Sequence, residues 1–555
     1  MSNFSFLQKE WSEIHDSATK AESYVNTDAR AACWYARMTL EQIVNWLYQY
    51  DPQFTSYEAS LGARIYDTTF RKNAGETIFE KATVIIQIGN RAAHAKSTKY
   101  NDAVIAVTEL FHVSYWLART YCKHERPQSN LQFHLSNIPT AQLATITLEQ
   151  LKKQEEALKQ KQAENEVLKN KSKHVDAIQA ELTQLRAEIA KAKQANQSVL
   201  DSHDYNEAQT RDYFIDVLLN EAGWELDKKD DREFEVQGMP NNKGVGYVDY
   251  VLWGNDGKPL AVVEAKRTRK DATVGQQQAK LYADCLEARY KRRPVIFYTN
   301  GYEHWFWDDT QAAPRRVEGF YTKDELELLM QRRTSKLSLA TTPINEGVAG
   351  RSYQQQAIRS VTEAIEHHNQ RRSLIVMATG AGKTRTVIAL VDLLVRCNWA
   401  KRVLFLADRV SLVKQATKAF VKFSPNLGVV NLLDNVDSQG RVYVSTYPTM
   451  LGLINDVSSE VKRFGVGHFD LIIVDEAHRS IYSKYSALFR YFDGYLVGLT
   501  ATPKDEIDRN TYSLFELQKG VPTYAYGLEE AIADQYLVPP KAQSVPLKFV
   551  REGIK

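Results

Sequence analysis

Apolar residues recur at helical spacing through the first part of the chain. Between Ala31 and Tyr48 they fall every three or four residues, which predicts an amphipathic helix. Ala82–Ile88 and Ala103–Tyr121 follow the same spacing. We therefore predict a helical domain over residues 1–145.

A second pattern begins near residue 146, where Lys, Glu, Gln, Ala and Leu dominate and Gly and Pro are absent. Its second half steps alternately by three and four residues, which is the spacing of a coiled-coil seam. The seam positions are Val175, Ile178, Leu182, Leu185 and Ile189. Residues 146–200 are thus predicted to form a long helical, coiled-coil-like arm. It either remains a solvated spacer or packs on another part of the chain or on a partner.

Two α/β regions are expected beyond the arm. Residues 201–335 mix short apolar strands with helices, and a mostly polar connector follows them. Residues 350–540 alternate apolar strand runs with helices, as expected of a parallel sheet. The predicted fold class is therefore multidomain, with a helical domain and arm followed by two α/β domains.

Composition narrows the class of protein. The net charge is only +3 over 555 residues, so a surface that binds nucleic acid must be local. The four cysteines lie far apart without a CxxC pair, which argues against a zinc site or a disulfide framework. No apolar run reaches the roughly 18 residues of a membrane helix, and no signal peptide is apparent. These features predict a cytoplasmic protein with no membrane partner.

A candidate metal-dependent nuclease site lies on a predicted hairpin. Tyr247–Trp253 and Leu260–Lys266 are predicted strands around a strong turn signal. If Asp256 and Gly257 are the central turn residues, counting outward places Asp249 opposite Glu264. Side chains so placed lie about 5 Å apart at Cβ. Two such carboxylates repel unless a cation lies between them, and Mg²⁺ accepts this arrangement.

Lys266 is the third member of this candidate site. It lies two residues beyond Glu264 and should point to the same face of the strand. A lysine there can orient the attacking water or stabilise the charge of the phosphorane. A solvent-facing charged stripe is the alternative, which the apolar residues on both faces of the strand disfavour. The combination of Asp249, Glu264 and Lys266 also arises by chance in unrelated sequences. A nuclease assignment therefore needs a further motif beside these three residues.

A candidate nucleotide site follows in the next region. Ser373–Met377 is a predicted buried strand that runs into a glycine-rich loop, and a helix is expected from Lys383. Backbone N–H groups of such a loop cradle phosphates. Lys383 is expected to reach the β- and γ-phosphates of ATP, and Thr384 to hold Mg²⁺. Met377 occupies the first glycine position of the strict phosphate-loop pattern.

A second apolar strand, Leu471–Val474, feeds an acidic pair. Asp475 at its end is expected to hold the metal and Glu476 to activate water for hydrolysis. The residues predicted to bind ATP are Gln354, Thr379, Gly380, Ala381, Gly382, Lys383, Thr384, Asp475, Glu476 and His478.

The hairpin and the helix after it resemble the PD-(D/E)xK nuclease domain of type I restriction enzyme motor subunits. The catalytic set that the resemblance implies is Asp249, Glu264, Lys266, Gln278 and Tyr282. Gln278 and Tyr282 match the Q-x-x-x-Y element that this family carries on the helix after the lysine strand. Glu207, on the helix expected before the hairpin, becomes a candidate for a further metal ligand. One departure is Val248, which stands where the family nominally has Pro.

The later region resembles a superfamily 2 helicase or translocase. Besides the phosphate loop and the acidic pair, Arg351 and Tyr353-Gln354 resemble the adenine-reading motif. Leu404–Arg409 and Val444–Tyr447 resemble strand-contacting motifs, and Leu499–Pro503 resembles the motif that couples hydrolysis to movement. These elements occur in the order that the family has.

Together, the resemblances are to the motor and endonuclease (R) subunit of a type I restriction enzyme. They imply ATP-dependent translocation of double-stranded DNA, Mg²⁺-dependent cleavage of unmethylated DNA, and a complex with methyltransferase and specificity subunits. Because such motors close ATP between two lobes, residues 541–555 are expected to begin a second lobe of a larger subunit.

Three alternatives stay open. One is a stand-alone nuclease–helicase for DNA repair or phage defence. Another is an assembly scaffold without catalysis, which the intact Asp249, Glu264 and Lys266 disfavour. Arg91 and His94 also suggest an RNase of the HEPN type, although that type separates Arg and His more widely. A cluster of hydrogen-bonding residues at a helix end is favoured there.

Overall fold

The computed structural model describes most of the chain: residues 2–56, 60–93, 98–124, 126–129, 131–140, 149–151, 153, 156, 160, 175–196, 205–268, 270–454, 463–477, 479–502, 506–507 and 509–539. The chain divides into two compact units. The first contains Met1–Thr334, Pro448–His468 and Ser483–Asp493, and the second contains Ser335–Tyr447, Phe469–Tyr482 and Gly494–Lys555.

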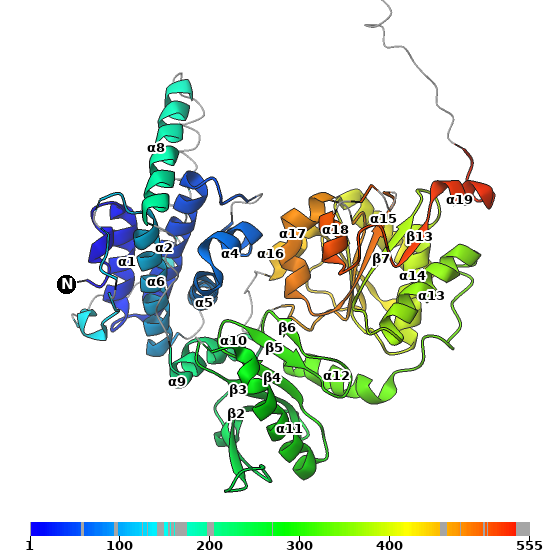
Figure 1. The fold of residues 1–555 in the computed structure, drawn as a ribbon, viewed down its shortest axis with the longest axis horizontal. Helices are drawn as coiled ribbons and strands as arrows, with labels where there is room; N and C mark the ends of the chain where they lie inside the picture. Colours follow the sequence, from blue (N-terminus) through cyan, green and yellow to red (C-terminus); the bar gives the residue numbers. More distant parts are fainter. Residues whose placement is uncertain are drawn as a thin grey trace, which may run out of the picture. The chain divides into compact units, whose positions relative to one another are not determined.

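The first unit begins with a helical domain (Figure 1). Its elements are η1 (Ser5–Leu7), α1 (Ser12–Tyr24), α2 (Ala29–Tyr50), α3 (Leu61–Ile65), α4 (Thr68–Ala74), α5 (Glu76–Ala93), α6 (Tyr100–Tyr121) and η2 (Leu135–Asn137). The three helical segments predicted from the sequence lie within α2, α5 and α6. Asp28 caps α2 by accepting a hydrogen bond from the backbone N–H of Ala31. A Cβ at Gly89 would lie 2.4 Å from Cβ of Arg37, so glycine lets α5 approach α2 closely.

The end of the arm packs on this helical domain. In α8 (Val175–Asn196), Ile189 is buried in the core and Leu185 packs against it. Arg186 donates to the carbonyl of Gln49 at 3.0 Å, and Lys193 Nζ donates to Asp51 Oδ2 at 2.6 Å. The last two seam positions therefore favour an arm that packs on its own chain. The side chains of the other three seam positions lie outside the described residues.

The first unit also contains a six-stranded sheet, in the order β1-β2-β3-β4-β5-β6. The strands are β1 (Arg232–Gln237), β2 (Val245–Trp253), β3 (Pro259–Ala265), β4 (Val295–Thr299), β5 (His304–Trp307) and β6 (Arg315–Val317). Only β3 and β4 pair in parallel among these strands, because α11 crosses over between them. The helices are α9 (Glu207–Thr210), the π-helix η3 (Arg211–Ile215), α10 (Asp216–Glu221), η4 (Lys229–Asp231), η5 (Ala272–Gly275), α11 (Gln276–Tyr290) and α12 (Lys323–Ser335).

The turn between β2 and β3 differs from the predicted one. The N–H of Gly257 donates to the carbonyl of Gly254 at 3.1 Å, so the central turn residues are Asn255 and Asp256. Gly257 follows with φ of 70°, in the left-handed region that glycine adopts at little cost. The prediction of Asp256 and Gly257 as the central pair was wrong, because the sequence signal suits both turn types.

This turn shifts the strand pairing by one position close to the loop. Trp253 faces Pro259 there, and an irregularity between Leu252 and Trp253 then restores the predicted register. Leu252 faces Ala261, as counted from the predicted turn. The two departures cancel before the candidate acidic residues are reached.

The second unit holds a seven-stranded parallel sheet in the order β13-β7-β12-β11-β8-β10-β9 (Figure 1). Its strands are β7 (Arg372–Met377), β8 (Val403–Ala407), β9 (Val429–Asn431), β10 (Val442–Thr446), β11 (Leu471–Val474), β12 (Tyr495–Thr500) and β13 (Tyr524–Tyr526). The helices of this unit are α13 (Ser352–Glu366), α14 (Lys383–Arg396), α15 (Val410–Phe423), η6 (Pro425–Leu427), α18 (Arg509–Leu514) and α19 (Leu528–Ala533). Two further helices, α16 (Tyr447–Ile454) and α17 (Arg479–Tyr491), belong for most of their length to the first unit. Strands covered on both faces explain the nearly continuous apolar runs of the sequence. No described helix combines the length and apolarity needed to cross a membrane.

Candidate functional sites

The first candidate site lies where β2 and β3 run side by side. The last recorded pair of this ladder is Tyr250 with Val263, and one more step along the same register reaches Asp249 and Glu264. Both carboxylates are buried, with 8% and 1% of their surface exposed. Burying two acidic groups so close together is unfavourable unless cations face them.

Lys266 is one such cation. Its Nζ contacts Glu264 Oε1 and donates to Gln278 Oε1 at 3.2 Å. Gln278 Nε2 donates in turn to the hydroxyl of Tyr282 at 2.7 Å. Gln278 and Tyr282 are one turn apart on α11 and so share a face. Four of the five predicted catalytic residues therefore form one continuous set of contacts.

Helix α11 begins close to the acidic pair. A Cβ at Gly275 would lie 3.1 Å from Cγ of Glu264, so the small residue before the helix lets its first turn approach the carboxylate. Burial raises the pKa of Tyr282, and the nearby carboxylates of Glu264 and Asp249 add to that effect. Tyr282 is therefore a neutral hydroxyl that anchors Gln278.

Arg211 is a member of this site that the sequence did not indicate. Its Nη1 donates to Asp249 Oδ1 at 2.9 Å and lies 3.1 Å from Glu233 Oε1. The N–H of Ala265 donates to the other oxygen of Asp249 at 2.7 Å. Although burial acts to lower it, the pKa of Arg211 is raised by the Asp249 carboxylate. In the structure, Arg211 lies on a π-helix, and π-helical turns are frequent at functional sites.

The donor set suits a hard divalent cation. Asp249 and Glu264 offer carboxylate oxygens, the ligands that Mg²⁺ prefers, and cationic side chains already contact both. Among the described residues, no group of three or more His, Cys, Asp or Glu side chains gathers as a metal site. Glu207 is the first residue of α9, but its side chain lies outside the described residues.

The second candidate site is the loop that joins β7 to α14. Gly380 and Gly382 adopt φ of 85° and 89°, which gives the loop its tight path. The carbonyl of Ala381 accepts hydrogen bonds from Tyr353 OH at 2.8 Å and from Gln354 Nε2 at 3.4 Å. Helix α13 therefore holds the loop from behind through both residues of the Tyr-Gln pair.

The rest of the loop is open to a ligand. Thr379 and Gly380 are exposed, whereas Lys383 and Thr384 are half-buried in the first turn of α14. The positive end of the helix dipole and free N–H groups at this terminus suit a phosphate.

The acidic pair follows β11 as predicted from the sequence. Burial and the charge of Glu476 raise the pKa of Asp475 to about 6, while Lys383 opposes the rise. Glu476 has φ of 52°, an uncommon value for a residue with a side chain. Tyr447 donates to the carbonyl of Asp475 at 3.2 Å, a contact that the sequence did not indicate. His478 lies outside the described residues.

Arg91, which with His94 suggested an RNase of the HEPN type, is hydrogen-bonded to Asp102 in the helical domain. Arg91 Nη2 donates to Asp102 Oδ1 at 3.2 Å, and Asp102 Oδ2 accepts from the N–H of Lys99 at the start of α6. This arrangement supports the interpretation as a hydrogen-bonding cluster at a helix end. His94 lies outside the described residues.

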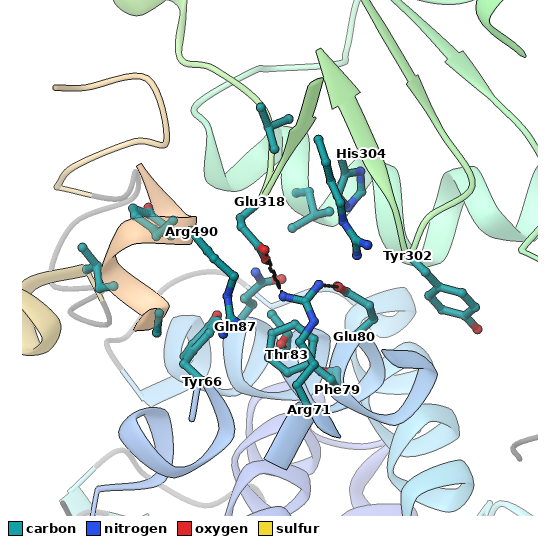
Figure 2. Close-up of a pocket in the computed structure, with 16 residues that line it drawn as sticks. Tyr66, Arg71, Phe79, Glu80, Thr83, Gln87, Tyr302, His304, Glu318 and Arg490 are labelled. Carbon is teal, nitrogen blue, oxygen red and sulfur yellow. Dashed lines mark hydrogen bonds and ion pairs between the residues drawn. The ribbon is translucent and has the colours of Figure 1, made fainter. Parts of the chain in front are cut away.

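One further cavity lies between the helical domain and the six-stranded sheet. Figure 2 shows Arg71 between Glu318 and Glu80, at 2.9 and 3.8 Å. Burial raises the pKa of Glu80 well above its ordinary value, and Arg71 partly offsets that rise. The cavity holds only about 30 Å³, room for a water molecule but not for a substrate. It belongs to the packing of the helical domain on the sheet.

Comparison with known proteins gives two family matches. Residues 347–505 match the family described as type III restriction enzyme, res subunit. Residues 232–315 match the family described as type I restriction enzyme R protein N terminus.

Curated relatives agree with these matches. The EcoAI endonuclease subunit of a type I restriction enzyme from Escherichia coli is 32% identical, over 61% of this chain and 43% of its own length. The EcoKI endonuclease subunit from Escherichia coli K12 is 26% identical, over 84% of this chain and 49% of its own length. A solved fragment described as an HsdR subunit, from Vibrio vulnificus YJ016, is 29% identical over 60% of this chain and 61% of that one, with a TM-score of 0.28. The chain spans about half the length of the curated relatives. In sequence, it is similar to endonuclease subunits of type I restriction enzymes.

Proposed function

We propose that this chain carries the nuclease and the first ATPase lobe of a type I restriction endonuclease. In this proposal, ATP hydrolysis moves double-stranded DNA and the nuclease cuts unmethylated DNA. The observation that carries it is the contact chain Glu264–Lys266–Gln278–Tyr282 beside Asp249, in one polypeptide with a phosphate loop.

Each residue of the nuclease has a role in the proposal. Asp249 and Glu264 would hold Mg²⁺, which when bound would polarise the scissile phosphate and lower the pKa of a bound water. Lys266 would stabilise the charge that develops on the phosphorane, from a position that Gln278 fixes. Tyr282 orients the amide of Gln278, and Arg211 orients Asp249. Desolvation around the buried acids strengthens these interactions.

The ATPase roles are separate from these. Lys383 and the N–H groups of the loop would bind the β- and γ-phosphates, while Thr384 and Asp475 would hold the Mg²⁺ of the nucleotide. Glu476 would orient and deprotonate the attacking water. Gln354 is positioned beside the loop, where it can read the base and sense the phosphates.

Partners follow from the relatives, which are named as endonuclease subunits of type I restriction enzymes. We therefore propose double-stranded DNA and the methyltransferase and specificity subunits as the partners of this protein. Site recognition would lie in the specificity subunit, because contacts to phosphates carry no direct information about the base sequence.

Two variants of the assembled enzyme test the proposal. Glu264→Ala should abolish cleavage of unmethylated circular DNA while ATP hydrolysis continues, because its carboxylate lies in the six-stranded sheet domain. Lys383→Ala should abolish hydrolysis and cleavage together. Cleavage at the wild-type rate by a folded Glu264→Ala enzyme would remove the nuclease assignment.

A further inference from the structure

A basic turn follows directly after Lys266. Arg267 and Lys270 are both exposed, and the N–H of Lys270 donates to the carbonyl of Arg267 at 2.9 Å. This bond closes a turn, so the Cα atoms of the two residues lie within about 7 Å of each other. The backbones of the two cationic residues are thus close together, and Arg267 directly follows the buried Lys266. Arg269 between them lies outside the described residues.

These two cations lack the carboxylate partners that several arginines of the sheet domain have. Neighbouring arginines are held by carboxylates: Arg292 pairs with Asp256, Arg293 with Asp284 and Asp309, Arg316 with Glu303 and Arg333 with Asp308. Within the described residues, no side-chain hydrogen bond or ion pair is recorded for Arg267 or Lys270. Their positive charge is therefore available to a ligand from solution.

The backbone of the turn is nevertheless held firmly. The hydroxyl of Thr268 accepts the N–H of Tyr205 at 3.1 Å, and Asn300 Nδ2 donates to the carbonyl of Lys270 at 2.8 Å. After the turn, Asp271 accepts the N–H of Thr273 at 2.9 Å and caps η5. A fixed backbone with exposed cations loses little entropy when it binds a rigid partner.

Tyr205 is itself anchored in the helical domain. Its hydroxyl donates to Glu109 Oε1 at 2.5 Å and lies 2.9 Å from His112 Nδ1. Lys81, fully buried, lies 3.1 Å from the same nitrogen of His112. The helical domain therefore fixes the position of the basic turn through a buried polar cluster.

We propose that Arg267 and Lys270 bind phosphates of duplex DNA and so place one strand at Glu264 and Lys266. The inference rests on the proposed nuclease. Successive phosphates of a strand are closely spaced, so two cations at the ends of one turn can contact neighbouring phosphates. Exposed cations without internal carboxylate partners, on a preformed backbone beside buried acids, match the polyanionic backbone of DNA in charge.

The salt dependence of DNA binding tests this inference. Each phosphate contact adds about 0.9 to the slope of log affinity against log salt concentration. The purified 555-residue chain is titrated with a short fluorescent duplex, without nucleotide, between about 50 and 200 mM salt. The double variant Arg267→Ala/Lys270→Ala should reduce the slope by about 1.8. Arg267→Lys, which keeps the charge, should retain the wild-type slope.

Lys258→Ala is the matched control. Lys258 is exposed but lies in the hairpin turn at the opposite end of β3. Its replacement removes one positive charge, half of what the double variant removes. Its slope should equal that of the wild type. An unchanged slope for the double variant, or an equal loss for Lys258→Ala, would overturn the inference. Because this titration requires no cleavage, its failure is distinct from wild-type cleavage by Glu264→Ala, which would instead remove the proposed nuclease.

Discussion

Replacing Gly382 by alanine should strongly weaken nucleotide binding. Gly382 adopts φ of 89°, and a Cβ there would lie only 2.6 Å from Nε2 of Gln354. The substitution therefore strains the backbone and displaces the amide that contacts the carbonyl of Ala381. Without nucleotide, the loop of the variant can relax away from the left-handed conformation at residue 382. Nucleotide binding must bring that strained conformation back, and the energy this takes lowers the affinity.

The expected loss follows from these two effects. A left-handed conformation costs a residue with a side chain about 1–2 kcal/mol. Loss of a hydrogen bond by the displaced Gln354 adds about 0.5–1.5 kcal/mol. The sum, about 1.5–3.5 kcal/mol, corresponds to roughly a 10- to 400-fold increase in Kd.

A titration of the chain with a fluorescent ATP analogue and Mg²⁺ measures this change. Gly520→Ala is the matched control, because Gly520 also has a left-handed φ of 81° but a Cβ there would have nothing within 4 Å. The control should lower the free energy of unfolding by about 1–2 kcal/mol and leave the nucleotide Kd unchanged. Wild-type affinity in a folded Gly382→Ala chain would refute the reasoning.

Three further outcomes are expected. Tyr282→Phe removes the hydroxyl group that accepts a hydrogen bond from Gln278. The assembled enzyme should then cut DNA roughly 2- to 10-fold more slowly, with unchanged ATP hydrolysis. A normal cleavage rate would contradict the anchoring role of Tyr282. Burial and the charge of Glu476 raise the pKa of Asp475 to about 6, so this carboxyl group is protonated below pH 6. The affinity of the chain for Mg²⁺-nucleotide should therefore fall about tenfold per pH unit below that value. The Asp475→Asn variant should bind Mg²⁺-nucleotide weakly, with no such pH dependence. Burial lowers the pKa of His304 from 6.5 to about 3, so only the unfolded chain takes up this proton between those values. Urea unfolding monitored by tryptophan fluorescence should show stability falling by about 1.4 kcal/mol per pH unit as pH drops below 6.5, and His304→Gln should lose that component.

The proposed nucleotide site could be predicted from the sequence because its parts are local. A strand, a glycine-rich loop and the first turn of a helix are consecutive, so the spacing of Gly380, Gly382 and Lys383 already specifies their geometry. The acidic pair likewise follows its strand directly. What the sequence did not show is how helix α13 supports the loop, since the contact of Tyr353 with Ala381 spans 28 residues.

The hairpin of the proposed nuclease was predicted for a reason that proved partly wrong. Its turn uses Asn255 and Asp256 at the centre, and the pairing next to the loop is displaced by one residue. An irregularity beyond Trp253 compensates for that displacement. A prediction of register from turn type alone therefore succeeded only because two deviations of opposite sense occur within a few residues. The Gln278–Tyr282 spacing was the more robust signal, since helical periodicity does not depend on the turn.

Long-range contacts explain what remained invisible in the sequence. Arg211 reaches Asp249 across 38 residues, and Tyr205 reaches Glu109 across 96. In a single sequence, an arginine in a helix is indistinguishable from one on any solvated face. Both contacts nevertheless stabilise buried polar groups near the candidate nuclease site. Arg211 offsets the charge of a buried carboxylate, and Tyr205 connects a buried polar cluster of the helical domain to Thr268, just after the nuclease lysine. The helical domain thus contributes, through the position of Tyr205, to the geometry of the proposed nuclease site.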